Sequence, residues 1–157
     1  MKIKILIMLF SIFFTHFTNC LAMKNIEADR AALGGITVGS SANYIKSIYG
    51  EPKEIKTDYD KNKNKNLTFV TWYYGDTFQI RFVNETVASV TSSGNNGLTT
   101  PDGVSVGMKK NIMRSTYGKP AQVDKYNSRA IYSYNVDNNF NMLFLIKNGI
   151  ISEIRIF

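Results

Sequence analysis

The sequence predicts an α+β fold in which two tandem helix-plus-antiparallel-strand units form one curved sheet, with the helices packed on one face. The main observation is an internal repeat: residues 35–55 recur as residues 103–123 at a constant offset of 68, and eight of the 21 aligned positions are identical. In each copy, apolar residues recur at helical spacing, and the segments that follow alternate between apolar and polar residues. Similarity at one fixed offset indicates a duplicated folding unit.

Residues 1–22 are predicted to form a secretory signal peptide. Lys2 and Lys4 give a basic start, residues 5–17 are almost entirely apolar, and residues 20–22 (Cys-Leu-Ala) offer small side chains where a signal peptidase reads them. The apolar run is too short for a comfortable membrane span. We therefore expect the mature protein to be periplasmic or secreted.

Lipidation is the alternative fate of this segment. Cys20 would then become the acylated first residue of an outer-membrane lipoprotein, and the protein would contact the membrane. Residues 17–20 match that processing signal poorly, because Phe17 and Asn19 occupy positions that normally hold Leu and a small residue. Membrane contact is expected only if Cys20 is lipidated.

Removal of the leader also removes the only cysteine, Cys20, and the only histidine, His16. The remaining chain has no thiol nucleophile, no imidazole base and neither of the common transition-metal ligands. Ser/His/Asp and Cys/His chemistry are therefore excluded. We expect no catalytic residues, no metal and no cofactor, and we expect that the protein is not an enzyme.

The charge of the mature chain is moderate. Without Lys2 and Lys4 its formal net charge is +5. Several lysines alternate with Asp58 and Asp60 in an Asn-rich stretch, which is typical of a solvated loop. We expect no nucleic-acid partner, and the charge supports only a weak preference for anionic surfaces or acidic partners.

The chain divides as follows. Residues 23–34 are polar and are expected to be an N-terminal tether. Repeat unit 1 covers residues 35–93, and repeat unit 2 covers residues 103–157. Between them, residues 94–102 are rich in turn-forming residues and make the natural linker.

Each unit is predicted to begin with a short amphipathic helix that ends at a glycine followed by a proline. Apolar and aromatic residues recur at helical spacing before Tyr49 and before Tyr117, so each helix has one face to bury. A glycine at position 50 or 118 suits the left-handed conformation that closes a helix, and a proline follows two residues later.

Strands are predicted after each helix. Residues 67–74 and 130–134 are rich in aromatic and β-branched residues, and residues 54–58 and 122–126 are further short candidates. Period-two alternation then assigns one set of side chains to the core: Phe78, Ile80, Phe82, Met142, Phe144 and Ile146. In the last strand of each unit, Val87 with Val90 matches Ile151 with Ile154.

These patterns together resemble a known family. The motif Val-Gly-x5-Ile/Met-x3-Tyr-Gly-x-Pro, followed by an aromatic strand and a closing hairpin, resembles the unit of the SmpA/OmlA (BamE-type) outer-membrane assembly lipoproteins. The tandem arrangement is similar to the β-lactamase-inhibitory protein and its relatives. The resemblance covers residues 35–157. It implies helices on one side of a continuous antiparallel sheet whose other face is free to bind protein.

Two sets of strand residues are candidates for binding. Trp72, Tyr74, Tyr132 and Tyr134 form either an aromatic platform or part of the core. The opposite strand face carries exposed types found at interface centres, and we assign protein binding to it. Its residues are Thr71, Tyr73, Gln79, Arg81, Leu143, Leu145 and Arg155.

The sequence thus favours an exported, non-enzymatic protein-binding module of the bacterial cell envelope or exterior, whose partner is another protein. An outer-membrane assembly or scaffolding lipoprotein is one alternative. A hydrolase acting on cell walls or polysaccharides is another, and it would need paired carboxylates, for which only Glu51, Glu54 and Asp102 stand out.

Overall fold

The computed structural model describes residues 25–59 and 68–157. The predicted signal peptide, with His16 and Cys20, lies outside the described residues, as does the loop at residues 60–67. In chain order the elements are a 3₁₀ turn (Ala28–Arg30), α1 (Ala42–Tyr49), β1 (Glu54–Tyr59), β2 (Thr68–Tyr73), β3 (Phe78–Val83), β4 (Thr86–Ser92), α2 (Lys110–Tyr117), β5 (Gln122–Tyr126), β6 (Arg129–Val136), a second 3₁₀ turn (Asp137–Asn139), β7 (Phe140–Lys147) and β8 (Ile150–Ile156).

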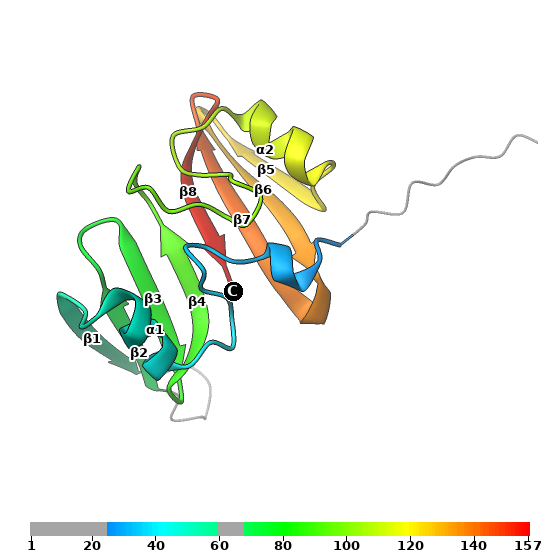
Figure 1. Ribbon diagram of the computed structural model, residues 1–157. Coiled ribbons are helices and arrows are strands. Elements are labelled where there is room, and N and C mark those ends of the chain that lie inside the picture. Colours follow the sequence, from blue (N-terminus) through cyan, green and yellow to red (C-terminus); the bar gives the residue numbers. More distant parts are fainter. Residues whose placement is uncertain (1–24, 60–67) are drawn as a thin grey trace, which may run out of the picture.

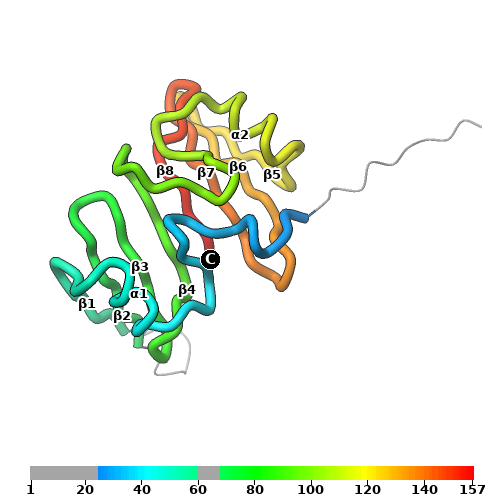
Figure 2. Tube along the Cα trace, in the orientation of Figure 1, coloured from blue at the N-terminus to red at the C-terminus, as the bar shows by residue number. Residues whose placement is uncertain are grey.

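The chain forms a single eight-stranded antiparallel sheet in the order β1-β2-β3-β4-β8-β7-β6-β5 (Figures 1 and 2). The predicted fold class, two tandem helix-plus-strand units, is therefore wrong. Strand β4 pairs directly with β8, and the buried side chains of both halves belong to one core cluster. The helices are minor elements of eight residues each. One continuous sheet satisfies the backbone groups that two separate units would expose at β4 and β8.

Both helices, the N-terminal segment and the linker cover the same face of the sheet (Figure 1). On that face Ile80 and Phe144 are fully buried, and the neighbours assigned to the core with them are buried too, so the period-two assignment is confirmed. Trp72, Tyr132 and Tyr134 are also buried and belong to the core rather than to a platform.

The helices bury less than their sequences predict. Ile45 of α1 and Met113 of α2 are the fully buried residues, whereas Tyr44, Ile48 and Ile112 are exposed. A helix of two turns lying across a wide sheet places only one row of side chains in contact with it. Most of the core comes from the strands.

A β-bulge explains the spacing of three in the last strand of each half. Register shifts occur between Arg81 and Phe82 in the β3–β4 pair, and between Leu145 and Ile146 in the β7–β8 pair. The extra residue lets Val87 and Val90 both face the core, although plain alternation would send them to opposite faces. Ile151 and Ile154 are buried in the same way.

The Tyr-Gly ending of each helix is held by a tyrosine from the sheet. Tyr74 Oη donates to the carbonyl of Gly50 at 2.9 Å, and Tyr134 Oη donates to the carbonyl of Gly118 at 3.2 Å. Both glycines adopt positive φ angles, 71° and 76°. Burial raises the pKa of the Tyr134 hydroxyl to about 12, so it remains a neutral donor at physiological pH.

The segment expected to be a tether packs into the core instead. Ile26 and Leu33 are buried, and Ile26 exchanges backbone hydrogen bonds with Asn135 and Asp137 in the second half. Arg30 then pairs with Asp102 in the linker at 3.0 Å. Three apolar residues of this mostly polar segment, Ile26, Ala31 and Leu33, are buried, and its overall composition does not reveal this packing.

Replacing Ile80 or Phe144 by Ala is expected to lower the free energy of unfolding by about 2–5 kcal/mol, the usual cost of emptying a packed core site. Urea unfolding measures the change. Thr57→Ala on the exposed strand β1 is the control and should change stability by less than about 0.5 kcal/mol. Losses of only a few tenths at both core positions would contradict the assigned faces.

The equivalent hairpin turns of the two halves allow a second test. Glu85 follows Asn84 and has a φ of 60°, whereas Gly149 follows Asn148 and has a φ of 78°. A left-handed conformation costs a non-glycine residue about 1–2 kcal/mol, partly offset by the larger backbone entropy that glycine loses on folding.

We therefore expect Glu85→Gly to stabilise the protein by about 0.5–1 kcal/mol and Gly149→Ala to destabilise it by a similar amount. Thermal and urea unfolding measure both changes. A loss of stability in Glu85→Gly would mean that the Glu85 side chain contributes more than its backbone strain costs.

Candidate binding site on the uncovered sheet face

The face of the sheet opposite the helices carries one continuous row of side chains. Strand pairing aligns these residues across all eight strands, so that each is the direct neighbour of the next. In sheet order they are Glu54, Tyr73, Gln79, Thr91, Arg155, Leu143, Ser133 and Gln122. Among the described residues, no helix or loop segment covers this face (Figure 1). Most of the row is therefore open to contact, whereas Thr91 within it is buried.

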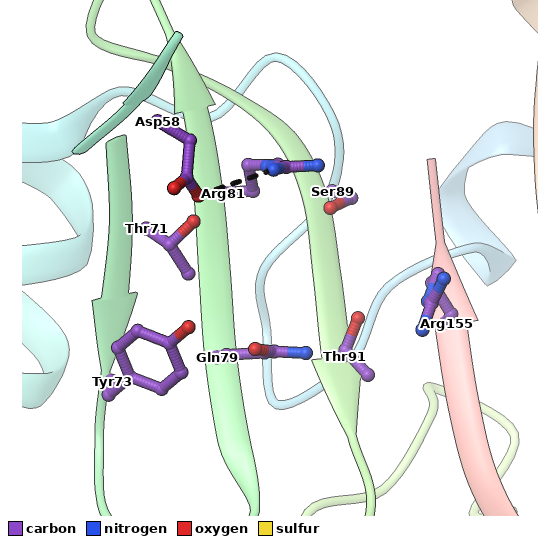
Figure 3. Close-up of a pocket in the computed structure, with 8 residues that line it drawn as sticks. All are labelled: Asp58, Thr71, Tyr73, Gln79, Arg81, Ser89, Thr91 and Arg155. Carbon is purple, nitrogen blue, oxygen red and sulfur yellow. Dashed lines mark ion pairs between the residues drawn. The ribbon is translucent and has the colours of Figure 1, made fainter. Parts of the chain in front are cut away.

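A polar pocket of about 220 Å³ lies in the first half of this face. Its floor is formed where β4 presents small side chains, Ser89 and Thr91, between longer ones on both neighbouring strands. Arg81 is the register partner of Ser89, and Arg155 is the partner of Thr91 from the other side. Figure 3 shows these side chains standing on the same face of adjacent strands.

The depth of the pocket comes from the surrounding side chains. Thr71 and Thr91 are only 6% and 3% exposed, although no helix covers them. Tyr73, Gln79 and the two arginines stand around them and shield them from solvent. Thr71 and Thr91 therefore lie at the bottom of the pocket, below the longer side chains around them.

Each cation of the site is matched by a carboxylate. Arg81 pairs with Asp58 at 3.6 Å, and its guanidinium also lies 4.6 Å from the ring centroid of Phe69. Arg155 pairs with Glu153 at 2.7 Å. The pocket therefore presents oriented donors and acceptors with little net charge.

One donor in this pocket lacks a partner. Nε of Arg155 is buried and makes no hydrogen bond, because the ion pair with Glu153 uses Nη2. A buried donor without an acceptor costs free energy comparable to a lost hydrogen bond. A ligand oxygen would remove that cost only after a shift of the Arg155 side chain that brings Nε to the pocket surface.

The structure places all seven predicted binding residues on this face, in two groups. Thr71, Tyr73, Gln79, Arg81 and Arg155 line the pocket. Leu143 and Leu145 lie on β7 beyond it, where both are half-buried. The two residues of β7 beside the pocket are therefore apolar, and the polar residues Ser133 and Gln122 continue the row beyond Leu143.

Sequence reasoning missed three lining residues. The sequence places Asp58 both at the end of a short candidate strand and in a solvated, Lys- and Asn-rich stretch, and gives it no binding role; in the structure it is the fifth residue of β1 and pairs with Phe69. Ser89 and Thr91 were missed because the bulge changes the phase of β4 after Val87. A Val-x-x-Val spacing inside a predicted strand is the signal that could have located them.

The three carboxylates considered for hydrolysis do not form a pair. Glu51 pairs with Lys46, Glu54 with Lys56, and Asp102 with Arg30. Across residues 25–59 and 68–157, no cluster of His, Cys, Asp and Glu is placed to hold a metal ion. The same two ranges contain no helix that is both long and apolar enough to span a membrane.

Comparison with known proteins gives a likeness of fold only. The sequence matches no protein-family model and no curated protein. A cysteine-rich secretory protein from Staphylococcus aureus subsp. aureus Mu50 has a similar structure, with a TM-score of 0.52, 12% identity, and coverage of 85% of this chain and 50% of that one.

An extracellular protein containing a SCP domain, from Bacillus anthracis str. Ames, gives a TM-score of 0.48 and 11% identity, with coverage of 77% of this chain and 44% of that one. The chain thus spans half the length, or less, of the solved structures it matches.

The Arg81–Asp58 ion pair is expected to contribute little to stability, since the two side chains are 45% and 63% exposed. Arg81→Ala and Asp58→Ala should each lower the free energy of unfolding by at most about 1 kcal/mol, and the interaction energy from the double variant should fall with added salt. A loss above about 2 kcal/mol for Arg81→Ala would identify a structural residue instead.

Proposed function

We propose that this protein is an exported, non-enzymatic binding module of the bacterial cell envelope or exterior, and that it binds another protein through the uncovered face of its sheet. Export is supported by the basic and apolar leader at residues 1–22. Export is also in keeping with the similar fold of the S. aureus protein, a cysteine-rich secretory protein.

The polar pocket on an uncovered sheet face is the observation that carries this proposal. Tyr73, Arg81 and Arg155 are residue types that often dominate binding energy at interface centres. Leu143 and Leu145 extend the face with apolar area next to Arg155. A polar, hydrogen-bonding pocket beside a half-buried apolar strip is typical of a protein interface.

The pocket chemistry favours a partner that inserts an oxygen-bearing side chain. Arg155 Nε has no acceptor of its own, Thr91 is the register neighbour of Arg155, and Ser89 lines the pocket beside Arg81. A carboxylate or amide oxygen fits this set of donors, and the nearby Asp58 and Glu153 make the orientation of the incoming group selective. The resemblance to the BamE-type and inhibitory-protein repeats also favours a protein as the partner.

Site-specific cross-linking tests the proposal. A photo-reactive amino acid placed at Gln79 should capture a discrete partner in envelope extracts of the producing cells, since Gln79 lines the pocket. The double variant Tyr73→Ala/Arg81→Ala, combined with the same cross-linker, should lose most of that product while its melting temperature changes by only a few degrees.

Tyr44→Ala/Arg114→Ala is the matched control. It removes the same residue types from exposed positions on the two helices, and it should leave cross-linking at Gln79 unchanged. Equal loss in both variants, or undiminished capture in the Tyr73/Arg81 variant, would remove the uncovered face from consideration.

A further inference from the structure

A second pocket lies in the second half of the chain, at the hairpin tips, and it is lined by basic residues without acidic partners in the described part of the chain. It has a volume of about 260 Å³ and is located between the start of α2 and the tips of the β5–β6 and β7–β8 hairpins. Figure 1 shows α2 and the β7–β8 hairpin meeting at this end of the sheet. Lys110, Lys125 and Arg129 line the pocket together with the turn residues Asn127 and Asn148. Lys109 and Lys147 lie at the same end of the sheet. Both are backbone pairing partners of Ile150, Lys147 through the β7–β8 ladder and Lys109 through an isolated bridge.

The cations of this pocket are unpaired in the part of the chain that the structure describes. There, no carboxylate forms an ion pair with Lys110, Lys125 or Arg129, and no carboxylate lines the pocket. The uncovered sheet face differs, because there Arg81 and Arg155 each have an acidic partner. At this end of the molecule three basic side chains therefore lie together, and none of them forms an ion pair with a described acid.

The fold itself does not require these cations. An equivalent groove exists in the first half, between α1 and the β3–β4 turn, and it is lined by Val70, Trp72 and Phe82. Strand register and the offset of 68 identify the position that matches each basic residue of the second half. The residues that match Lys109, Lys110, Lys125, Arg129 and Lys147 are Ser41, Ala42, Thr57, Phe69 and Val83. All five are uncharged, and the charged residues that line the groove of the first half, Lys46 and Glu85, are one of each sign.

We propose that the pocket formed by Lys110, Lys125 and Arg129 is a binding site for a phosphate-bearing anion. A guanidinium can bind phosphate oxygens in a bidentate manner, and two lysine ammonium groups add charge and further donors. The side-chain amides of Asn127 and Asn148 supply neutral donors at the rim. The site is separate from the polar pocket of the sheet face, and it does not depend on the function proposed for that face.

Phosphate chemistry can be presented by a soluble anion or by a lipid headgroup, and two probes separate these sources. Inorganic pyrophosphate is titrated into ¹⁵N-labelled protein expressed from the full-length sequence, and amide shifts are followed by NMR. Vesicles of phosphatidylglycerol and of phosphatidylcholine are tested in parallel by co-sedimentation.

The variant Lys110→Gln/Lys125→Gln should weaken binding of the responsive probe by about tenfold or more, because it removes two charge-assisted contacts. The control Lys53→Gln/Lys119→Gln removes the same net charge from exposed positions outside the pocket and should weaken binding less than about twofold.

Pyrophosphate binding with shifts centred on Asn127 and Asn148 would identify a site for soluble phosphate. Binding to phosphatidylglycerol vesicles alone, lost in the pocket variant, would identify a lipid headgroup site. The proposal is overturned if neither probe binds, or if the pocket variant and the control lose binding equally, since that would indicate only diffuse attraction to a basic protein.

Discussion

The pairing of β4 with β8 is the interaction on which the rest of the structure depends. It comprises only three register pairs, Val90 with Ile156, Thr91 with Arg155, and Ser92 with Ile154. The first and third of these involve core residues, so the seam also joins the hydrophobic interiors of the two halves. The middle pair brings Arg155 beside Thr91 and so completes the polar pocket. Two chain segments also connect the halves on the helix-covered face, the N-terminal segment and the linker. The N-terminal segment starts against β6, and the amide of Gly34 donates a hydrogen bond to the carbonyl of Thr99 in the linker before the chain enters α1.

Local features of this fold could be predicted from the sequence, and non-local ones could not. Alternation assigned Ile80 and Phe144 to the core correctly, because successive side chains of a strand point to opposite faces and the pattern can be seen in neighbouring residues. The β4–β8 seam joins residues about 65 positions apart, and periodicity carries no information about which strands become neighbours. The same limit applies to the site. Thr71, Tyr73, Gln79 and Arg81 follow from simple alternation, whereas Ser89 and Thr91 lie beyond a bulge that shifts the phase. The packing of Ile26 and Leu33 is decided by distant partners in β6 and the linker.

The two pockets use charge in opposite ways. On the uncovered face, the arginines are held by Asp58 and Glu153, which fixes the direction of their remaining donors and leaves little net field. At the hairpin tips of the second half, the basic side chains have no such restraint and together create a field that extends into solvent. The first arrangement suits recognition by shape and hydrogen-bond direction, and the second suits attraction of a charged group. The groove beside Trp72 in the first half is lined by one lysine and one glutamate, Lys46 and Glu85, in place of the three cations at the hairpin tips.

The open sheet also limits how copies of this chain could assemble. Its free edges, β1 and β5, lie at opposite ends of the strand order, and both expose apolar side chains such as Ile55 and Val123. Joining β1 to β1 relates two copies by a two-fold axis and uses both β1 edges, so growth through that contact alone stops at a pair, with a free β5 left at each end. Joining β1 of one copy to β5 of the next leaves a free edge at each end, and the sheet would then extend without limit. Charged residues along β1, Glu54, Lys56 and Asp58, oppose such extension, because each added copy would have to accommodate them beside its own edge strand.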